Sequence, residues 1–408
     1  MHILFLTDNF PPEGNAPATR TYEHAREWVK LGHKVTIITG APNFPEGKVF
    51  DGYENRWFQK EYLEGIQVRR VKTYITANEG FVKRVLDFLS FMVSSFVAGF
   101  FVKKVDVIVS TSPQLFTALS GWALSGIRRK PFVFELRDIW PASITAVGAM
   151  KTSLVIKFLE KLEIFLYKRA DMIISVTNSF KKELIGRGIA ANNIEVVLNG
   201  VDLAQYSPVE EKDLVLAESN KLVGKFVIGY VGTHGMAHAL ETVVSAAEIL
   251  KDYEDIRFLF AGGGAAKPSI EQLITSKNLS NVVSLPRQSK VDMPKVWSLC
   301  DISLISLKDA ALFKTVIPSK IFESMGMGIP MIASIPTGEA SAILERTKSG
   351  VVVAPESPQL LAQEILNLYN NKPKLLSISK NSAVSAVLFS RAKLAQCMLE
   401  NFEILLSK

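Results

Sequence analysis

Residues 313–333 contain side chains suited to holding a phosphorylated ligand. They read FKTVIPSKIFESMGMGIPMIA, so a Pro-Ser-Lys turn and a glutamate precede a strand-like run. Pro318 favours a first helical turn, and the free amides of such a turn, with Ser319 and Lys320 beside them, suit a diphosphate. Glu323 follows one turn later, where it would accept bonds from ribose hydroxyls. An ordinary helix start in an α/β protein has the same residues, so the segment alone leaves both readings open.

A proline-glycine loop follows the first strand-like run and offers a second place for a phosphate. Its sequence is TDNFPPEGNAPATR, in which Gly14 and Asn15 permit positive φ and a close approach of backbone amides to a ligand. The loop contains neither GxGxxG nor GxxxxGK[ST], which argues against a dinucleotide fold or a P-loop ATPase. The alternative is a surface turn that caps the following helix.

The run ELRDIWP, residues 135–141, places charged and aromatic side chains at the end of a buried strand. Glu135, Arg137 and Asp138 are costly there unless a ligand or mutual pairs satisfy them. Carboxylates accept sugar hydroxyls, and the indole of Trp140 suits the apolar face of a pyranose. We therefore expect these residues to orient sugar or acceptor, the alternative being a structural ion pair between Arg137 and Asp138.

Glycine-rich turns and basic residues also follow the strand-like runs of the second half. Glycines allow a ligand close to the backbone, and histidines either donate to a phosphate or are satisfied within the loop. The predicted donor-binding residues outside the loop at 14–15 and the segment at 318–323 are Gly232, Thr233, His234, His238, Gly263, Arg287 and Thr315. No Asp-x-Asp, HExxH or paired-cysteine motif occurs, so we expect no metal-bridged diphosphate, and helix ends and basic side chains must then neutralise a phosphorylated group.

Composition narrows the classes of protein. The 408 residues are 48% hydrophobic and 21% charged, typical of about two well-packed domains. The net charge of +7 favours anionic partners. Nucleic acid is the poorer choice, because the basic residues flank apolar helices rather than alternate with aromatics. Two cysteines without ligand spacing and the lack of a secretory signal indicate a cytoplasmic protein.

The elements that position these residues alternate between strand and helix. Apolar runs that alternate with helical patterns predict parallel strands covered on both faces, and hence two doubly wound α/β domains that face a cleft. We expect domains at residues 1–200 and 201–385, with a C-terminal helix at 386–408 returning to the first. The expected strands are residues 3–6, 34–39, 68–72, 105–110, 132–136, 172–176 and 194–198, then 226–231, 256–261, 282–285, 302–306, 329–334 and 351–353.

Residues 81–104 carry the strongest membrane signal. Residues 85–102 are nearly apolar, and lysines and arginines flank them on both sides. Eighteen residues barely span a bilayer, and Asp87 would be expensive in hydrocarbon. We therefore favour a helix that docks on the inner face of the plasma membrane or packs within the domain over one that spans it.

The ordered motifs together resemble a family 4 glycosyltransferase of the two-domain B-type fold (GT-B) over essentially the whole chain. The matching pieces are the loop at 10–15, GHKV at 32–35, NGVD at 199–202 and PSKIFESMGMGIPMIA at 318–333. The resemblance implies sugar transfer from a nucleotide donor with retention of configuration and without a metal. It also implies a donor on the C-terminal domain and an acceptor on the N-terminal one.

Three positions depart from the pattern that the resemblance implies. Thr315 stands where the family usually has a glutamate, and Thr233 and His238 align with its diphosphate-binding arginine and lysine. Lys320 is the expected replacement for the missing cations, and leaving-group stabilisation is usually the dominant electrostatic contribution to such a reaction.

The resemblance extends to enzymes that assemble O-antigen and capsule repeats, including N-acetyl-L-fucosamine transferases. It implies a UDP-sugar donor and an undecaprenyl-diphosphate-linked acceptor. Two alternatives remain at this stage: a sugar-nucleotide epimerase or hydrolase of the same fold, and a non-catalytic GT-B partner protein.

Overall fold

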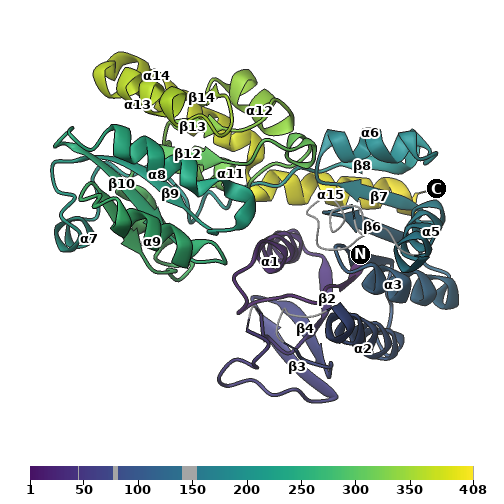
Figure 1. Cartoon of the computed structure of the whole chain (residues 1–408). Coiled ribbons are helices and arrows are strands. Elements are labelled where there is room, and N and C mark those ends of the chain that lie inside the picture. The colour runs from purple at the N-terminus through teal and green to yellow at the C-terminus, as the bar shows by residue number, and fades with distance from the viewer. Residues whose placement is uncertain (45, 77–80, 140–153, 408) are drawn as a thin grey trace. The chain divides into compact units, whose positions relative to one another are not determined.

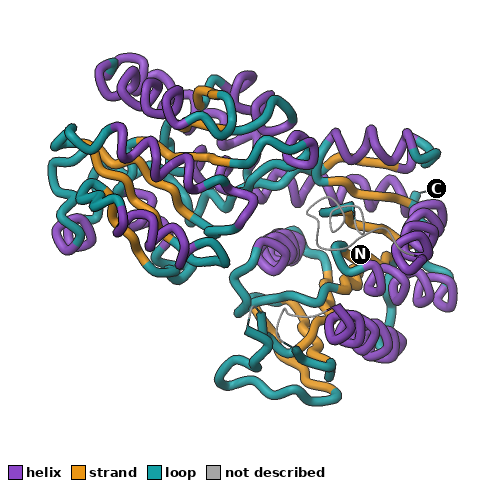
Figure 2. Tube along the Cα trace, in the orientation of Figure 1, coloured by secondary structure: helices purple, strands orange, loops and turns teal. Residues whose placement is uncertain are grey.

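The computed structural model describes residues 1–44, 46–76, 81–139 and 154–407. The chain forms two compact units, residues 1–198 with 391–408, and residues 199–390. Figure 1 labels the helices and strands of each unit, and Figure 2 shows strands bordered by helices in both. Trp140 and Pro141 of the ELRDIWP run lie outside the described residues.

In the described part of the first unit, eight strands form one sheet in the order β3-β4-β2-β1-β5-β6-β7-β8. All neighbours pair in parallel except β3, which is antiparallel to β4 at the edge of the sheet. The strands are β1 (His2–Leu6), β2 (Lys34–Gly40), β3 (Phe58–Leu63), β4 (Ile66–Val71), β5 (Val107–Thr111), β6 (Phe132–Leu136), β7 (Met172–Ser175) and β8 (Ile194–Val196).

Helices cover both faces of this sheet because alternate residues of a strand point to opposite sides. Ile3 and Phe5 pack in one cluster with the first and last helices, whereas Leu4 and Leu6 pack in another with the second and third. The helices are α1 (Ala16–Lys30), α2 (Phe81–Phe100), α3 (Leu115–Arg128), α5 (Leu154–Arg169), α6 (Asn178–Gly186), a 3-10 turn η1 (Ala191–Asn193) and α15 (Arg391–Leu406).

The C-terminal helix α15 is an integral part of the first unit. The Trp28 indole of α1 donates to the carbonyl oxygen of Ala395 at 2.9 Å, and Arg391 forms a buried ion pair with Glu23 at 2.7 Å. Met398 and Phe402 lie in the same buried cluster as Trp28. The two ends of the chain therefore build one core.

In the second unit, all of whose residues are described, six parallel strands form a sheet in the order β11-β10-β9-β12-β13-β14. Chain order reverses between β9 and β12, and ligands of such sheets bind beyond the carboxyl ends of the strands at this switch point. The strands are β9 (Phe226–Val231), β10 (Ile256–Ala261), β11 (Val282–Leu285), β12 (Ile302–Ser306), β13 (Met331–Ser334) and β14 (Gly350–Val353).

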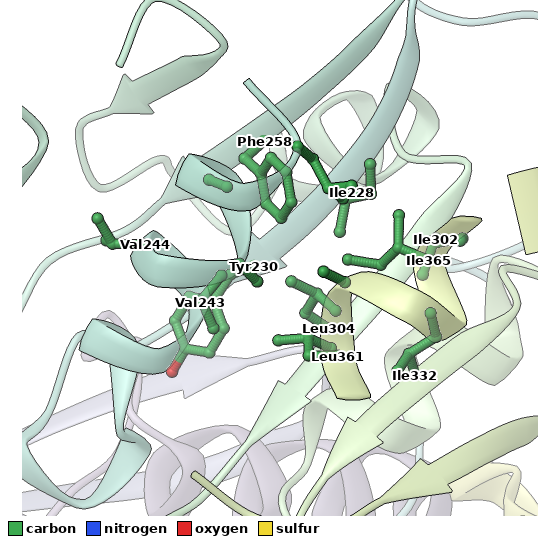
Figure 3. Packing of buried hydrophobic residues seen from close by; sticks show 14 of the residues in the cluster. Ile228, Tyr230, Val243, Val244, Phe258, Ile302, Leu304, Ile332, Leu361 and Ile365 are labelled. Atoms are coloured by element: carbon green, nitrogen blue, oxygen red, sulfur yellow. The ribbon is translucent and has the colours of Figure 1, made fainter. Parts of the chain in front are cut away.

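The core of the second unit lies between the sheet and the helices α8, α9, α13 and α14. Ile228 and Tyr230 of β9 pack there with Val243, Leu361 and other apolar side chains, as Figure 3 shows. The helices are α7 (Leu214–Ser219), η2 (Met236–His238), α8 (Leu240–Ile249), α9 (Lys267–Ser276), α10 (Met293–Ser298), η3 (Ala311–Lys314), α11 (Lys320–Gly326), α12 (Glu339–Thr347), α13 (Pro358–Asn370), α14 (Lys372–Ala386) and η4 (Val387–Phe389). The predicted fold class, two doubly wound α/β domains, is confirmed.

Candidate functional site

Five residues at the switch point of the second sheet form what we call the Tyr230 cluster: Tyr230, Gly232, His234, His238 and Lys320. The Lys320 Nζ atom lies 3.4 Å from the centroid of the Tyr230 ring. The ring centroids of His234 and His238 lie 5.6 and 6.0 Å from that of Tyr230. Sequence positions 90 residues apart therefore meet around one aromatic ring.

Two interlocking glycine turns fix the backbone of the cluster. Gly232 follows β9 at φ +129°, and the loop after β10 contains Gly262 and Gly264, also at positive φ. A Cβ atom on Gly262 would lie 1.9 Å from the carbonyl oxygen of Gly232, and one on Gly264 would lie 2.5 Å from that of His234. Only glycine permits this approach, so the sequence holds His234 against the neighbouring loop.

Hydrogen bonds complete the arrangement of the two loops. The His234 amide donates to the carbonyl oxygen of Gly263 at 2.9 Å, and the Tyr230 hydroxyl donates to that of Thr233 at 2.7 Å. The His238 Nδ1 atom lies 3.3 Å from the carbonyl oxygen of Ser306, which ends β12. The exposed Arg287 lies beside Gly263: a Cβ atom added to this glycine would be 3.9 Å from the Cβ atom of Arg287.

Two basic side chains of the cluster are buried and have nitrogen atoms without a hydrogen-bond partner. Lys320 is 7% exposed and His234 is 1% exposed. Among the described residues, neither the Lys320 Nζ atom nor either His234 ring nitrogen has a hydrogen-bond partner. Buried polar groups are normally paired, so unpaired groups at a switch point make Lys320 and His234 candidates for contacts to a ligand.

Burial sets the protonation of these groups. Desolvation lowers the pKa of Lys320 to about 7, against a smaller opposing effect of the Glu323 carboxylate. Desolvation also lowers the pKa of His234 to about 4, with the charges of Lys267 and Lys320 adding to the shift, and that of His238 to about 4. Without a ligand the two histidines are neutral at pH 7 and Lys320 is only partly protonated, whereas an anion nearby would favour the protonated forms.

The start of α11 gives the geometry of the predicted diphosphate turn. The helix α11 begins at Lys320, and the amides of Ile321 and Phe322 donate to the carbonyl oxygens of Pro318 and Ser319. These two amides are occupied by the turn itself, and the contact of Ser319 and Lys320 with a diphosphate stays a prediction. Glu323 is half-buried one turn beyond Lys320.

Thr315 has a local hydrogen bond of its own. Its hydroxyl donates to the carbonyl oxygen of Leu312 at 2.8 Å, at the end of the short helix η3. This bond caps the turn before Pro318 and gives Thr315 a structural function. The effect of this threonine on sugar binding stays a prediction.

In the first unit, Glu135 and Arg137 bond to other parts of the protein. Glu135 is 1% exposed and forms a 2.9 Å ion pair with Arg20 of α1, which also donates to the carbonyl oxygens of Val197 and Leu198. Burial alone would raise the pKa of Glu135, but the charges of Arg20 and Arg137 hold it below its usual value. The Oε1 atom of the carboxylate therefore pairs with Arg20, whereas the buried Oε2 atom has no hydrogen-bond partner among the described residues, and the expected contact of Glu135 with a sugar stays a prediction.

The neighbouring residues of the ELRDIWP run bond to backbone groups. The Arg137 guanidinium donates to the carbonyl oxygens of Ala16 and Pro17, at 3.0 and 3.1 Å. The Asp138 amide donates to the Ser112 hydroxyl, and its side chain is half-buried. Arg137 thus joins β6 to the start of α1, and Asp138 is left as the acidic group of this run at the surface.

The loop at Gly14 and Asn15 differs from the prediction in its backbone. Asn15 is extended at φ −77°, its side chain accepts from the Ala18 amide, and Gly14 is not among the residues with positive φ. The structure therefore has the helix-capping turn that the sequence left as the alternative. A phosphate contact of this loop stays a prediction.

Sequence reasoning missed Asp8, which lies at the switch point between β1 and β5. Its carboxylate accepts a hydrogen bond from the Gln114 amide of the loop after β5. Burial, together with the charges of Asp87 and Glu13, raises the pKa of Asp8 despite that bond. An aspartate directly after a first strand was the available signal, but its pairing with Gln114 follows only from the order of strands in the sheet.

Both units match known families of glycosyltransferases. Residues 17–205 match the family described as Glycosyltransferase Family 4, and residues 211–384 match Glycosyl transferases group 1. The chain belongs to glycosyltransferase family 4. This confirms the resemblance in the ordered sequence motifs.

Relatives of this family 4 glycosyltransferase cover its full length. The putative colanic acid biosynthesis glycosyl transferase WcaI of Escherichia coli is 27% identical over 90% of this chain and 91% of its own. The structure of Anabaena HepE in complex with UDP and glucose has a TM-score of 0.75 at 18% identity, over 99% of both chains. Sucrose-phosphate synthase from Thermosynechococcus elongatus has a TM-score of 0.78 at 16% identity, over 100% of this chain and 99% of its own. These structures share the GT-B fold with the chain.

Two searches of the described residues bear on membranes and metals. No described helix combines the length and the hydropathy that crossing a bilayer requires. No group of three or more His, Cys, Asp and Glu side chains suited to a metal ion occurs among those residues either. Metal-independent catalysis stays a prediction.

Proposed function

We propose that this glycosyltransferase moves a sugar, N-acetyl-L-fucosamine being one candidate, from a UDP-linked donor to a lipid-diphosphate-linked saccharide. The observation that carries the donor class is the Tyr230 cluster, in which Lys320 and His234 present buried, unpartnered donors at the switch point. A diphosphate supplies the oxygens that these groups lack. The structure of HepE with UDP and glucose, on a similar fold, supports the same choice.

The reaction that fits this site is a front-side displacement with retention. The bond from the anomeric carbon to the β-phosphate oxygen breaks, the acceptor oxygen bonds to that carbon from the same face, and its proton passes to the departing phosphate. Lys320 contributes by stabilising the charge that develops on the diphosphate, an effect worth about 3–4 kcal/mol for one well-placed donor. No side chain of the protein is required as a nucleophile, and no metal ion is required for this charge.

We infer that the acceptor belongs to a bacterial surface polysaccharide. The name of WcaI refers to colanic acid biosynthesis, and the match to WcaI spans nine-tenths of both chains. The resemblance in the sequence implies an acceptor linked to a lipid diphosphate, and with such an acceptor the enzyme would work at a membrane surface. The Asp8 carboxylate, at the switch point of the first sheet, is our candidate for an acceptor contact.

An exposed apolar stripe on α2 supports docking on the membrane. Leu86, Val93, Val97 and Phe100 are exposed and recur on one side of the helix. The polar stripe beside it is occupied by the protein, because Ser90 accepts from the Tyr74 amide and Ser94 donates to the carbonyl oxygen of Lys72.

Exposed cations just after α2 and on α5 favour a bilayer as the partner of the stripe. The exposed Lys103 and Lys104 follow the helix, and the exposed Lys157 lies on α5, whose Phe158 is also exposed. Apolar side chains beside lysines suit a bilayer that contains anionic lipids. We therefore place the enzyme on the inner face of the plasma membrane as a peripheral protein.

One experiment tests the assigned reaction. The protein is incubated with a panel of UDP-, GDP- and dTDP-sugars, with and without an undecaprenyl-diphosphate saccharide, and the release of nucleoside diphosphate is measured. We expect release from a UDP-sugar only when the acceptor is present. Release from donor alone would favour a hydrolase, and conversion of the donor to an isomeric nucleotide sugar without release would favour an epimerase. Absence of nucleotide binding in calorimetry would favour a non-catalytic GT-B partner.

A further inference from the structure

Three basic side chains surround a single buried ring in the Tyr230 cluster. Lys320 comes from the start of α11, His234 from the turn after β9 and His238 from η2, and all three approach Tyr230. Like charges this close in a poorly hydrated site repel strongly. The geometry therefore opposes full protonation of the cluster while no anion is present.

The groups that face the cluster do not cancel this repulsion. Lys267 of α9 adds a further positive charge toward His234, although its own ammonium group donates to the carbonyl oxygens of Gly262 and Leu285. Two carboxylates act in the opposite direction, Glu271 of α9 on His234 and Glu323 of α11 on Lys320.

The face of Tyr230 also favours an ammonium ion at Lys320. Desolvation remains the largest effect on Lys320, His234 and His238, and it lowers the pKa of each. Together these influences leave Lys320 as the group of the cluster that titrates nearest to neutral pH.

We propose that the Tyr230 cluster takes up a proton from solution when a nucleoside diphosphate binds. The anion supplies the hydrogen-bond acceptors that the Lys320 Nζ atom and the His234 ring lack in the described structure, and it offsets the repulsion between them. One proton moves from solvent to the side-chain nitrogen, most readily that of Lys320, and no covalent bond to the ligand forms. The inference rests on the donor site assigned above.

Proton uptake has a consequence for affinity. If binding adds a proton, then the affinity for the nucleotide must fall as the pH rises, by up to tenfold per pH unit for each proton taken up. The window is set by Lys320, whose pKa of about 7 in the empty protein would move upward with the anion bound. We therefore expect affinity for UDP to weaken between pH 7 and 9.

Isothermal titration calorimetry measures this uptake directly. UDP is titrated into the full-length protein at pH 8 in Tris and in HEPES, two buffers with different enthalpies of ionisation. At that pH the terminal phosphate of UDP is already ionised, because the second pKa of a phosphate is about 6. We expect uptake of roughly half to one proton per UDP, seen as a buffer-dependent heat.

Variants assign the proton to its site. Lys320→Arg keeps a cation that does not lose its charge, so UDP should still bind and the uptake should fall toward zero. Lys295→Arg on α10, whose side chain is more than half exposed and pairs with Asp292, is the matched control and should keep the uptake of the unaltered protein. Uptake that persists in Lys320→Arg but disappears when His234→Gln and His238→Gln are added would still support the cluster.

Two outcomes would overturn the inference, and they differ in meaning. UDP binding at pH 8 without any buffer-dependent heat would overturn proton uptake and leave the donor site intact. Failure of UDP to bind in either buffer would overturn the proposed donor class, and this inference with it. If Lys320→Arg does not fold, the test is the affinity of the unaltered protein for UDP between pH 7 and 9. An affinity that does not change over this range contradicts proton uptake.

Discussion

The Lys320 Nζ atom lies over the ring of Tyr230, 3.4 Å from its centroid, and this contact joins α11 to β9 at the switch point of the second sheet. An aromatic face stabilises a cation without neutralising it. Lys320 is therefore held in place and remains available to an anion, which makes it the first residue to test.

Removing the amine of Lys320 should slow the reaction more than it disturbs the fold. Lys320→Met keeps an unbranched apolar chain, and we expect the rate of acceptor-dependent nucleotide release to fall by about 10²- to 10³-fold. Lys295→Met, on the exposed face of α10, should retain the full rate. A loss of less than about threefold in Lys320→Met would contradict a role of this lysine at the phosphates.

The same lysine should make stability depend on pH. Its pKa is about 7 in the folded protein, below its ordinary value of 10.5, so the unfolded chain binds more protons between these values. Stability therefore rises with pH in this range, and we expect Lys320 to contribute about 2 kcal/mol of that rise between pH 7 and 9. Urea unfolding of the protein and of Lys320→Met at both pH values measures the difference. Parallel curves for the two proteins would refute it.

The glycine loop after β10 should tolerate alanine at Gly263 but not at Gly262. Gly262→Ala places a Cβ atom 1.9 Å from the carbonyl oxygen of Gly232 at φ +147°, so we expect a loss of at least about 2 kcal/mol in stability. Gly263→Ala meets only Arg287 Cβ at 3.9 Å and should unfold at nearly the same urea concentration as the unaltered protein. Equal effects of the two changes would show that the loops do not interlock as described.

Replacing Glu135 should lower the free energy of unfolding more than it affects sugar binding. Glu135→Gln leaves Arg20 buried with no matching charge, and we expect a cost of about 3 kcal/mol in urea unfolding. Glu364→Gln, which breaks the more exposed pair with Lys374, should cost less than about 1 kcal/mol. Unchanged stability together with a raised KM for the donor or the acceptor would restore the original sugar-binding interpretation.

The α2 stripe should be required for binding to anionic membranes. Val93→Glu combined with Val97→Glu removes apolar contact and adds negative charge, so partition onto phosphatidylglycerol vesicles should fall roughly tenfold or more. Val215→Glu on α7, at a valine that is also exposed, is the control in the second unit. Co-sedimentation that is unaffected by the double change would place the membrane contact elsewhere or remove it.

Much of the fold follows from the sequence because parallel strands are buried on both faces. Runs such as VDVIVS and DMIISV contain few polar residues and lie at β5 and β7. The edge strand β3, with the sequence FQKEYL, was not predicted, because its alternating and half-exposed residues look like a polar loop. Its antiparallel pairing with β4 depends on tertiary contacts that no local pattern contains.

The candidate site was predictable where glycine and basic residues follow strands. His234 and Lys320 were found in this way, and the structure brings them to one ring. Tyr230 was missed because an aromatic residue in the strand FVIGYV cannot be told from a core residue by its pattern. Glu135 and Arg137 were expected to need a ligand or each other, because a sequence does not show that Arg20, 115 residues away, pairs with Glu135.

The two places where the chain passes between units are next to each other. Residues 199–390 form the second unit, and near its ends the Val201 amide donates to the carbonyl oxygen of Phe389 at 3.0 Å. The second unit is therefore an insertion whose two ends lie next to each other. It interrupts the sequence of the first unit, whose last helix, α15, follows the insertion. During synthesis on the ribosome, Ala395 is made 367 residues after its hydrogen-bond partner Trp28, when all residues of the second unit have already been added to the chain.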